Sequence, residues 1–255
     1  MRIYRIAREG GPSYARASDP ADEFLELLSA APWDGGIPTG DRVSARGAKL
    51  LAPVTPSKVV CVGRNYAAHA KELGNEVPSE PLLFLKPPSA VVGPDGDIVL
   101  PRASTRVEHE AEIGIVIGRR LHHASRSEAI DAIFGITCVN DVTARDLQRK
   151  DVQFTRGKGF DTFCPVGPWV ETQFALDALS VTGRVNGQLR QQGRATQMMF
   201  PIDMLVAFIT EVMTLEPGDL IATGTPEGVG PLHAGDVVEV AVTGVGMLQN
   251  RVVSV

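Results

Sequence analysis

An acidic pair at the start of an apolar run is the sequence feature that most constrains this fold. Glu112 opens a β-branched run that ends at Gly118, and such a run predicts a buried strand. Side chains two residues apart on a strand share a face, so Glu110 and Glu112 should point the same way, roughly 7 Å apart. A hard divalent cation between them would relieve their repulsion. The alternative is a solvated strand edge with Arg102 and Arg106 as counter-ions.

Size and charge exclude several classes of protein. The chain has 255 residues, which suits one large domain or one domain with a small appendage. The net charge of -5 and the lack of a Lys/Arg cluster argue against nucleic-acid binding. No apolar run is long enough to span a membrane, and the alternating residues 1–6 indicate a strand and not a signal peptide.

The cysteines bear on the cellular compartment. Cys61, Cys138 and Cys164 are widely spaced, and each lies in an apolar segment. This pattern predicts buried free thiols, not disulfides or zinc ligands. We therefore expect a cytoplasmic protein.

The first 55 residues differ in composition from the rest. They begin with one strand, and the apolar side chains within residues 21–31 predict a short helix before a segment rich in Gly and Pro. Pro53 and Pro56 bracket a linker. We expect a small, mostly β N-terminal subdomain at residues 1–55, with no chemistry of its own, and a catalytic domain at residues 56–255.

Three local patterns predict elements of the larger part. Ser125 and Glu128 have the spacing of a capping box for a helix that runs to about residue 133. Asn186 and Gly187 predict a type I′ hairpin turn. Residues 202–213 have the periodicity of an amphipathic helix.

A histidine and a glutamate share one face of a predicted short helix. Asn65 is its expected N-cap and Gly74 its expected stop. His69 and Glu72 are three residues apart, so the carboxylate could orient the imidazole and raise its basicity. A short helix flanked by glycine suits a mobile lid. The alternative is a surface pair without function.

Three more charged residues follow apolar strands or lie beside glycines. Lys86 directly follows the predicted apolar strand at residues 82–85. It could be a buried ammonium that meets an anion, or a solvated lysine at the end of the strand. Asp141 follows a predicted strand at 133–140, as a metal ligand or as the cap of the next helix. Lys158 lies between two glycines, which allow close approach of the backbone to a ligand; the alternative is a flexible loop.

A Gly-rich loop at residues 223–230 carries two hydroxyl side chains. It lacks the lysine and the spacing of a P-loop. Its backbone N–H groups and Thr225 could bind a carboxylate.

The acids together suggest a metal site. Glu110, Glu112 and Asp141 would leave open positions on a Mg²⁺, Mn²⁺ or Ca²⁺ ion, and no His/Cys set competes for zinc. Open positions on a hard cation suit a chelating small molecule such as a 2-oxo carboxylate.

Five motifs occur in the order typical of one family. They are GRNYAAH at 63–69, FLKP at 84–87, HEAE at 109–112, NDVTARD at 140–146 and TGTPEGVG at 223–230. Over residues 57–255 the chain resembles the fumarylacetoacetate hydrolase family. The likeness is to its smaller bacterial and mitochondrial members, which act on acylpyruvates, oxaloacetate and homoprotocatechuate-pathway acids. Residues 1–55 resemble the small N-terminal extension of some bacterial members.

This resemblance implies a fold and a metal. The fold would be mainly β with short helices (α+β), a mixed β-roll of a wound β-barrel type, usually in a homodimer. The ion would be Mg²⁺ or Mn²⁺, with Ca²⁺ as a substitute, held by Glu110, Glu112 and Asp141.

The resemblance also implies roles for other residues. His69 and Glu72 would form an acid/base dyad on a lid that orders over substrate, and Lys158 would stabilise a developing enolate. Gly159 stands where many relatives have Ser. The residues that would contact substrate oxygens are Arg64, Lys86, Gln148 and Thr225.

We therefore expect a metal-dependent enzyme that cleaves a C–C bond of a 2-oxo or 2,4-dioxo carboxylic acid, by hydrolysis or decarboxylation. The same electron sink also serves proton transfer, so isomerisation of a 2-hydroxy-dienedioate (2-hydroxyhepta-2,4-diene-1,7-dioate type) in aromatic catabolism is the alternative. An alternative of another class is a relative that binds a dicarboxylate without turnover. The metal acids and the His/Glu pair are all present, which argues against this last alternative.

Overall fold

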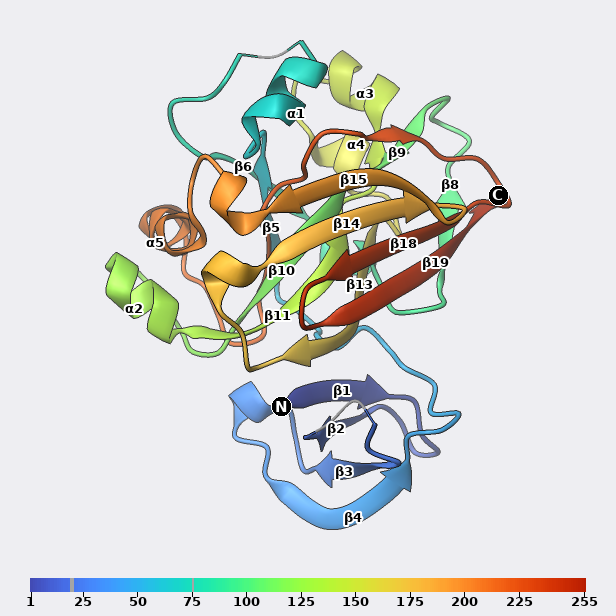
Figure 1. The fold of residues 1–255 in the computed structure, drawn as a ribbon, viewed down its shortest axis with the longest axis vertical. Helices are drawn as coiled ribbons and strands as arrows, with labels where there is room; N and C mark the ends of the chain where they lie inside the picture. The colour runs from blue at the N-terminus through green and yellow to red at the C-terminus, as the bar shows by residue number, and fades with distance from the viewer. Residues whose placement is uncertain (19–20, 75) are drawn as a thin grey trace.

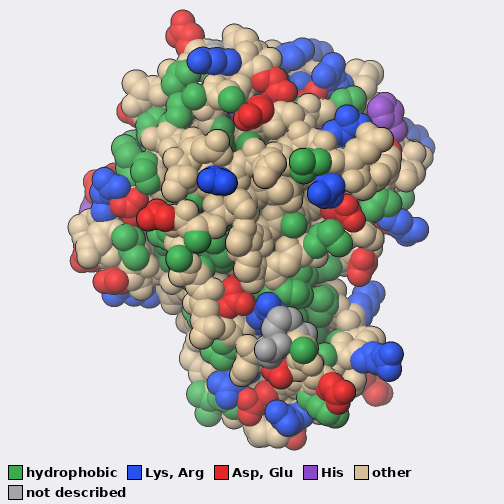
Figure 2. Space-filling model, viewed as in Figure 1, with side chains coloured by type: hydrophobic (Ala, Val, Ile, Leu, Met, Phe, Trp, Pro, Cys, Tyr) green, Lys and Arg blue, Asp and Glu red, His purple; other side chains and the backbone are tan. Residues whose placement is uncertain are grey.

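The computed structural model describes residues 1–18, 21–74 and 76–255 (Figure 1). The fold is mainly β with short helices, as predicted. A large sheet and a second sheet pack together in the main body, while the first four strands form a smaller unit below it in Figure 1. On the face drawn in Figure 2, acidic and basic side chains are interspersed over both parts.

The largest sheet has eleven strands, in the order β4-β3-β2-β1-β13-β11-β10-β16-β5-β6, with β7 beside β13. Its strands in the main body are β5 (Val59–Gly63), β6 (Leu82–Lys86), β7 (Val91–Val92), β10 (Ala111–Ile117), β11 (Ile133–Asn140), β13 (Cys164–Glu171) and β16 (Leu220–Ala222). The strand predicted from Glu112 to Gly118 is therefore β10, at the centre of the main body.

A five-stranded sheet packs against one face of the largest sheet, in the order β15-β14-β18-β19-β8. Its strands are β8 (Asp97–Leu100), β14 (Ser180–Val185), β15 (Gln188–Arg194), β18 (Val237–Val242) and β19 (Gly246–Ser254). A small third sheet joins β9 (Val107–His109), β12 (Thr143–Ala144) and β17 (Gly230–Pro231). These sheets do not close into a barrel within the described residues, so the expected wound barrel is corrected to open, packed sheets.

Strand β10 is buried on both faces, which explains its uninterrupted apolar run. Ile113 and Ile115 pack in the core between the two sheets, with Val181 of β14 and Val240 of β18. Val116 faces a second core on the other side of the largest sheet. The three cysteines are buried and free, as predicted.

The small N-terminal unit corrects one prediction. It consists of β1 (Arg2–Ile6), β2 (Ser13–Ala17), β3 (Phe24–Leu28) and β4 (Pro38–Ser44). The helix predicted within residues 21–31 is wrong, because these residues form β3. Leu25 and Leu27 are buried in alternation with Phe24 and Glu26, and β2 and β4 supply the hydrogen-bonding partners of the strand. The division of the chain at residue 55 stays a prediction.

The capping box, the amphipathic helix and the hairpin turn predicted for the main body are confirmed. Helix α5 (Ile202–Val212) is the amphipathic helix, and Ser125 and Glu128 form the capping box of α2 (Arg126–Asp131). Asn186 and Gly187 have φ values of 53° and 74° in the turn between β14 and β15. The remaining helices are α1 (Ala67–Glu72), α3 (Arg145–Lys150) and α4 (Thr155–Lys158), with 3₁₀ turns at Pro32–Asp34, Pro88–Ala90, Leu176–Ala178 and Ala195–Gln197.

None of the helices in the described ranges combines the length and the apolar character needed to cross a membrane.

The linker that precedes β5 is fixed by one buried carboxylate. Asp219 accepts hydrogen bonds from the backbone N–H groups of Ser57, Lys58 and Glu216, and from the Ser57 hydroxyl. It also pairs with the Lys58 ammonium. This residue therefore ties the start of β5 to β16, the two parallel strands beneath the site.

We expect Asp219→Ala to lower the free energy of unfolding by about 3 kcal/mol, because it leaves several buried donors without an acceptor. Urea denaturation monitored by circular dichroism would measure the change. Asp177→Ala, at an exposed position, serves as the control. Equal stabilities of the two variants would contradict this role of Asp219.

Candidate active site and metal centre

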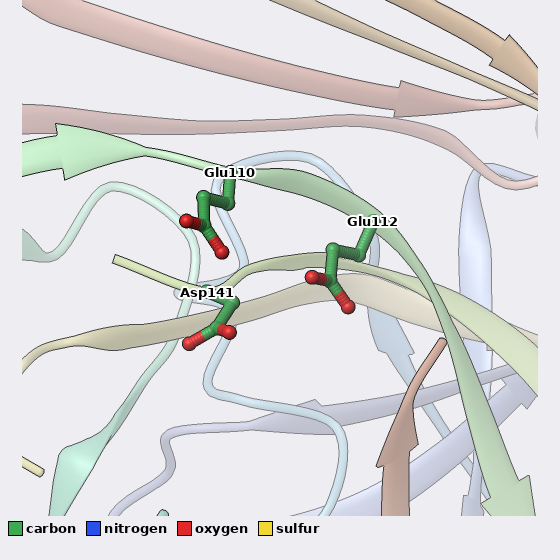
Figure 3. A group of neighbouring side chains, drawn as sticks. All are labelled: Glu110, Glu112 and Asp141. Carbon is green, nitrogen blue, oxygen red and sulfur yellow. The ribbon is translucent and has the colours of Figure 1, made fainter. Parts of the chain in front are cut away.

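Three acids from different parts of the chain converge at the ends of β10 and β11. Ala111 of β10 pairs with Asn140 of β11, which brings the neighbouring Glu110 and Asp141 together. Each of Glu110, Glu112 and Asp141 offers a carboxylate oxygen, and these oxygens lie within 4.8 Å of one another (Figure 3). All three side chains are buried, so the solvated strand edge is excluded.

Two buried lysines neutralise this cluster. Lys158 Nζ lies 2.7 Å from Glu110 Oε2 and 2.6 Å from Asp141 Oδ2. Lys86 Nζ lies 2.6 Å from Asp141 Oδ1 and 3.0 Å from the Val142 carbonyl oxygen. Both lysines are thus buried ammonium groups that meet anions, and neither is a solvated side chain.

A buried arginine, which the sequence did not single out, adds a third cation beside the cluster. Arg145 Nε donates to Glu108 Oε2 at 2.7 Å, and the same guanidinium pairs with Glu110 and with the Gln148 side chain. Arg145 opens α3, whose N-terminus has no side-chain cap, so Asp141 does not cap this helix. The only signal in the sequence was its place in the NDVTARD motif at residues 140–146.

The environments of the acids differ in charge compensation. Burial would raise the pKa of Glu110, but Lys158 and Arg145 lower it overall. Burial, together with Asp141 and Glu110 nearby, holds the pKa of Glu112 well above its usual range. Glu112 accepts one hydrogen bond, from Gly224 N at 2.8 Å. This under-compensated carboxyl beside two other hard oxygen donors fits a divalent cation.

A cavity of about 260 Å³ opens onto the acids. Its lining includes Lys158 and His69 together with the three carboxylates, so the metal candidates and the proton-transfer candidates face one space. Phe84 and Leu73 add apolar surface to its wall. A small chelating molecule bound to the acids would therefore contact both sets of side chains.

The structure brings His69 and Glu72 together, with the histidine more deeply buried than the glutamate. His69 is buried and lines the cavity, so it is not a surface residue, whereas the Glu72 side chain is 34% exposed. His69 Nδ1 lies 3.4 Å from Glu72 Oε2, and the backbone N–H of Gly228 holds the Glu72 carboxylate at 3.0 Å and 3.1 Å. The dyad is thus oriented by the loop at residues 223–230.

The ends of α1 differ in part from prediction. Asn65 is not its N-cap; its amide instead donates to the carbonyl oxygens of Phe200 and Thr223. Gly74 has the left-handed φ of 69° expected of a helix stop. Asn65 therefore anchors the segment that leads into the dyad to the Gly-rich loop.

The predicted substrate contacts are brought together in part. Arg64, Gln148 and Thr225 line the cavity. The backbone of Arg64 has a left-handed φ of 57°, and such strained conformations cluster at functional sites. Lys86 is absent from the lining, and its buried ammonium donates to Asp141 and to the Val142 carbonyl oxygen. At Gly159, a Cβ atom would lie 2.6 Å from the Thr155 carbonyl oxygen, so this backbone leaves no room for Ser.

Comparison with known proteins agrees with this geometry. Residues 58–253 match the family described as fumarylacetoacetate (FAA) hydrolase C-terminal, and residues 1–53 match the family Rv2993c-like, N-terminal. The chain is 45% identical over 197 residues to a mitochondrial oxaloacetate decarboxylase of Dictyostelium discoideum, covering 74% of this chain and 90% of that protein. It is 42% identical over 220 residues to oxaloacetate tautomerase YisK of Bacillus subtilis, covering 80% and 73%.

A solved structure extends the likeness to the whole chain. The crystal structure of 2-hydroxyhepta-2,4-diene-1,7-dioate isomerase from Mycobacterium marinum superposes with a TM-score of 0.91 at 42% identity, covering 100% of this chain and 98% of that one. The family match, the relatives and the shared fold lead to one conclusion: this chain belongs to the fumarylacetoacetate hydrolase family of enzymes.

Proposed function

We propose that this enzyme is metal-dependent and cleaves a C–C bond of a 2-oxo or 2,4-dioxo carboxylic acid, by decarboxylation or hydrolysis. The observation that carries the proposal is the convergence of Glu110, Glu112 and Asp141 with Lys158 and His69 on one cavity. A bound Mg²⁺ or Mn²⁺ ion, with Ca²⁺ as a substitute, would supply Lewis acidity toward the carboxylate and 2-oxo oxygens.

The protein's own groups account for proton transfer and charge stabilisation. His69, oriented by Glu72, is placed to accept a proton from water or from the substrate carbon chain. An ammonium has three N–H donors, and Glu110 and Asp141 use two of those on Lys158. The third is available to a substrate oxygen that gains negative charge as an enolate forms.

Uncommitted cations favour a dicarboxylic substrate. Lys86, Lys158 and Arg145 are engaged by the buried acids, whereas Arg64 and Arg149 line the cavity and have no carboxylate partner in the described part of the chain. A carboxylate at the distal end of the substrate would pair with them. The decarboxylase and tautomerase relatives are named for oxaloacetate, which carries two carboxylates.

A second candidate is tautomerisation or isomerisation. It is favoured by the relatives named oxaloacetate tautomerase and 2-hydroxyhepta-2,4-diene-1,7-dioate isomerase. His69 could move a proton between carbon and oxygen with no bond cleavage, and the latter substrate class would place the enzyme in aromatic catabolism. We also expect a homodimer and a cytoplasmic location, although two of the relatives are named as mitochondrial.

Metal binding should depend on Glu112 and on pH. Glu112→Gln should weaken Mn²⁺ binding on the order of 10- to 100-fold, because one of three anionic ligands is lost. Wild-type affinity should rise with pH, because the raised pKa of Glu112 means that a proton must leave before the carboxylate binds a cation. Titration calorimetry in buffers of different ionisation enthalpy should report about one proton released per ion.

The control for this experiment is Glu227→Gln, an exposed acid of the neighbouring loop, which should leave Mn²⁺ affinity unchanged. Unaltered affinity in Glu112→Gln would contradict the metal assignment.

Turnover should require both a metal and His69. We expect oxaloacetate or an acylpyruvate to be consumed with Mg²⁺, and EDTA to abolish the activity. His69→Gln should lower kcat about 100-fold or more, as loss of a general base does. His122→Gln, an exposed histidine, is the matched control.

Product analysis then separates the candidate functions. Pyruvate from oxaloacetate indicates decarboxylation, and enol/keto exchange without pyruvate indicates tautomerisation. Activity that survives EDTA would refute metal dependence. Oxalate binding with Mn²⁺ but no turnover would indicate a non-catalytic binder of dicarboxylates.

Arg149 should select for a distal carboxylate. Arg149→Gln should raise KM for oxaloacetate about tenfold, the loss expected for one charge-assisted hydrogen bond. KM for an acylpyruvate with an apolar tail should stay the same. Lys150→Gln is the control, since this neighbour on α3 is exposed and outside the cavity lining. Equal effects on both substrates would contradict distal recognition by Arg149.

A further inference from the structure

A buried glutamine behind the cavity makes more polar contacts than its place on a hairpin strand suggests. Gln191 lies on β15, and its side-chain amide is fully buried. Its Oε1 lies 3.0 Å from the backbone nitrogen of Ala111 and 2.9 Å from His109 Nδ1. Its Nε2 donates to Thr225 Oγ1 and to the Pro226 carbonyl oxygen, both at 2.7 Å.

These contacts fix the direction of every hydrogen bond in the group. The Ala111 N–H can only donate, so the Gln191 atom facing it is the oxygen, and the other amide atom is the donor. Both N–H groups of that nitrogen are then used by Thr225 and Pro226. Because Thr225 Oγ1 receives one of them, its own proton goes to the Ala111 carbonyl oxygen at 2.9 Å. The Thr225 hydroxyl can accept a further hydrogen bond but cannot donate one to a substrate.

The loop held by Gln191 also contacts both halves of the site. Gly224 N donates to Glu112, a candidate metal ligand, and Gly228 N holds Glu72, the partner of His69. Thr225 and Pro226, between these two glycines, are the residues that Gln191 binds. Displacement of this point would therefore move contacts on the metal side and on the proton-transfer side together.

Strand β15 is shaped to receive this loop. At Gly193, a Cβ atom would lie 2.9 Å from Pro226 Cβ and 3.0 Å from Tyr66 Cε1. At Gly228, which has a left-handed φ of 96°, a Cβ atom would lie 2.0 Å from the Arg190 carbonyl oxygen. These close approaches mean that β15 sets the position of the loop. The side-chain amide of Gln191 forms hydrogen bonds both to this loop and to the acid-bearing segment.

We propose that Gln191 is a positioning residue of this enzyme: it couples the acid-bearing segment at the start of β10 to the loop that carries Thr225 and holds Glu72. The proposal rests on the proposed function, since it assigns Gln191 to the same site. Gln191 itself is not among the residues that line the cavity at the acids, so we assign it a positioning role and not a catalytic one.

Gln191→Glu tests the role of the two donors with little change in shape. The carboxylate keeps acceptors for Ala111 and His109 but loses both donors to the loop. We expect kcat/KM to fall about tenfold or more, the usual effect of losing a buried hydrogen bond. The melting temperature should fall, because a buried carboxylate that faces the unpaired Thr225 and Pro226 oxygens is costly. The Mn²⁺ dissociation constant should change less than kcat/KM, because Lys86, Lys158 and Arg145 still hold Glu110 and Asp141. Gln192→Glu, the exposed neighbour on the same strand, adds the same charge and should resemble the wild type.

Gln191→Met provides a neutral variant in case the added charge prevents folding, and the same loss of kcat/KM is expected. If Gln191 acts through Thr225, the effects of Gln191→Met and Thr225→Val on kcat/KM should not add in the double variant. Additive effects, an unchanged kcat/KM, or an equal loss of Mn²⁺ affinity and activity would overturn the proposal.

Measuring oxalate affinity in the presence of Mn²⁺ tests the positioning role of Gln191 independently of the proposed function. If the wild type converts none of the oxo acids, the proposed function fails, but oxalate binding still reports on loop position. We expect Gln191→Glu to weaken oxalate binding several-fold relative to Gln192→Glu. Equal oxalate affinity of the two variants would overturn the positioning role even if the enzyme is active.

Discussion

Burial of three carboxylates in one place is the constraint on which the rest of this structure depends. An unpaired buried charge is costly, so each acid needs a partner or a proton. Lys158 and Arg145 compensate Glu110, and Lys86 and Lys158 compensate Asp141. Within the described residues Glu112 forms no ion pair, and burial together with the nearby charges of Asp141 and Glu110 raises its pKa. The site is therefore complete in charge except at the position where a divalent ion would bind.

This charge balance depends on the arrangement of the strands. The antiparallel register of β10 and β11 places Glu110 and Asp141 side by side at the ends of these strands. Lys86 reaches the same place from β6, the outermost strand of the sheet. Helix α4 supplies Lys158, whose ammonium also lies 4.9 Å from the centre of the Phe84 ring. The rigid sheet thus carries the acids, while short helices and loops carry the groups that must meet a substrate.

Sequence patterns confined to a single strand or helix predicted most of the corresponding elements and the positions of the candidate site residues correctly. The apolar run after Glu112 predicted β10, and period-two geometry placed Glu110 and Glu112 on one side. The prediction of a helix in place of β3 failed because Leu25, Leu27 and Leu28 fit the apolar face of a short helix as well as a strand. Only pairing with β2 and β4 decides between the two structures. The assignment of Asn65 failed for a related reason, since its amide is used by residues far along the chain.

Long-range partners account for what the sequence could not predict. Lys86 and Asp141 are 55 positions apart, and Gln191 and Ala111 are 80 apart, so no local spacing indicates either contact. Arg145 stood inside a motif that resembled the family, yet its function in compensating Glu110 depends on a fold that brings α3 beside β9. Spacing along strands and a helix singled out the acids and the His69/Glu72 pair, and the family resemblance suggested their roles, whereas the direction of the hydrogen bonds around Thr225 required coordinates.

The same chemistry at the acid cluster can serve several reactions, so the choice among them must lie elsewhere in the cavity. Decarboxylation, hydrolysis and tautomerisation all need charge stabilised at the 2-oxo oxygen, and they differ in whether water enters and in which atom exchanges a proton with the base, the role we propose for His69. The cluster uses Lys86, Lys158 and Arg145 for its own neutralisation, so these cations cannot discriminate between substrates at the distal end. Discrimination therefore falls to the cavity wall formed by Arg64, Arg149 and the apolar side chains of Leu73 and Phe84. Relatives that share the acids but differ at this wall would share a mechanism and differ in substrate.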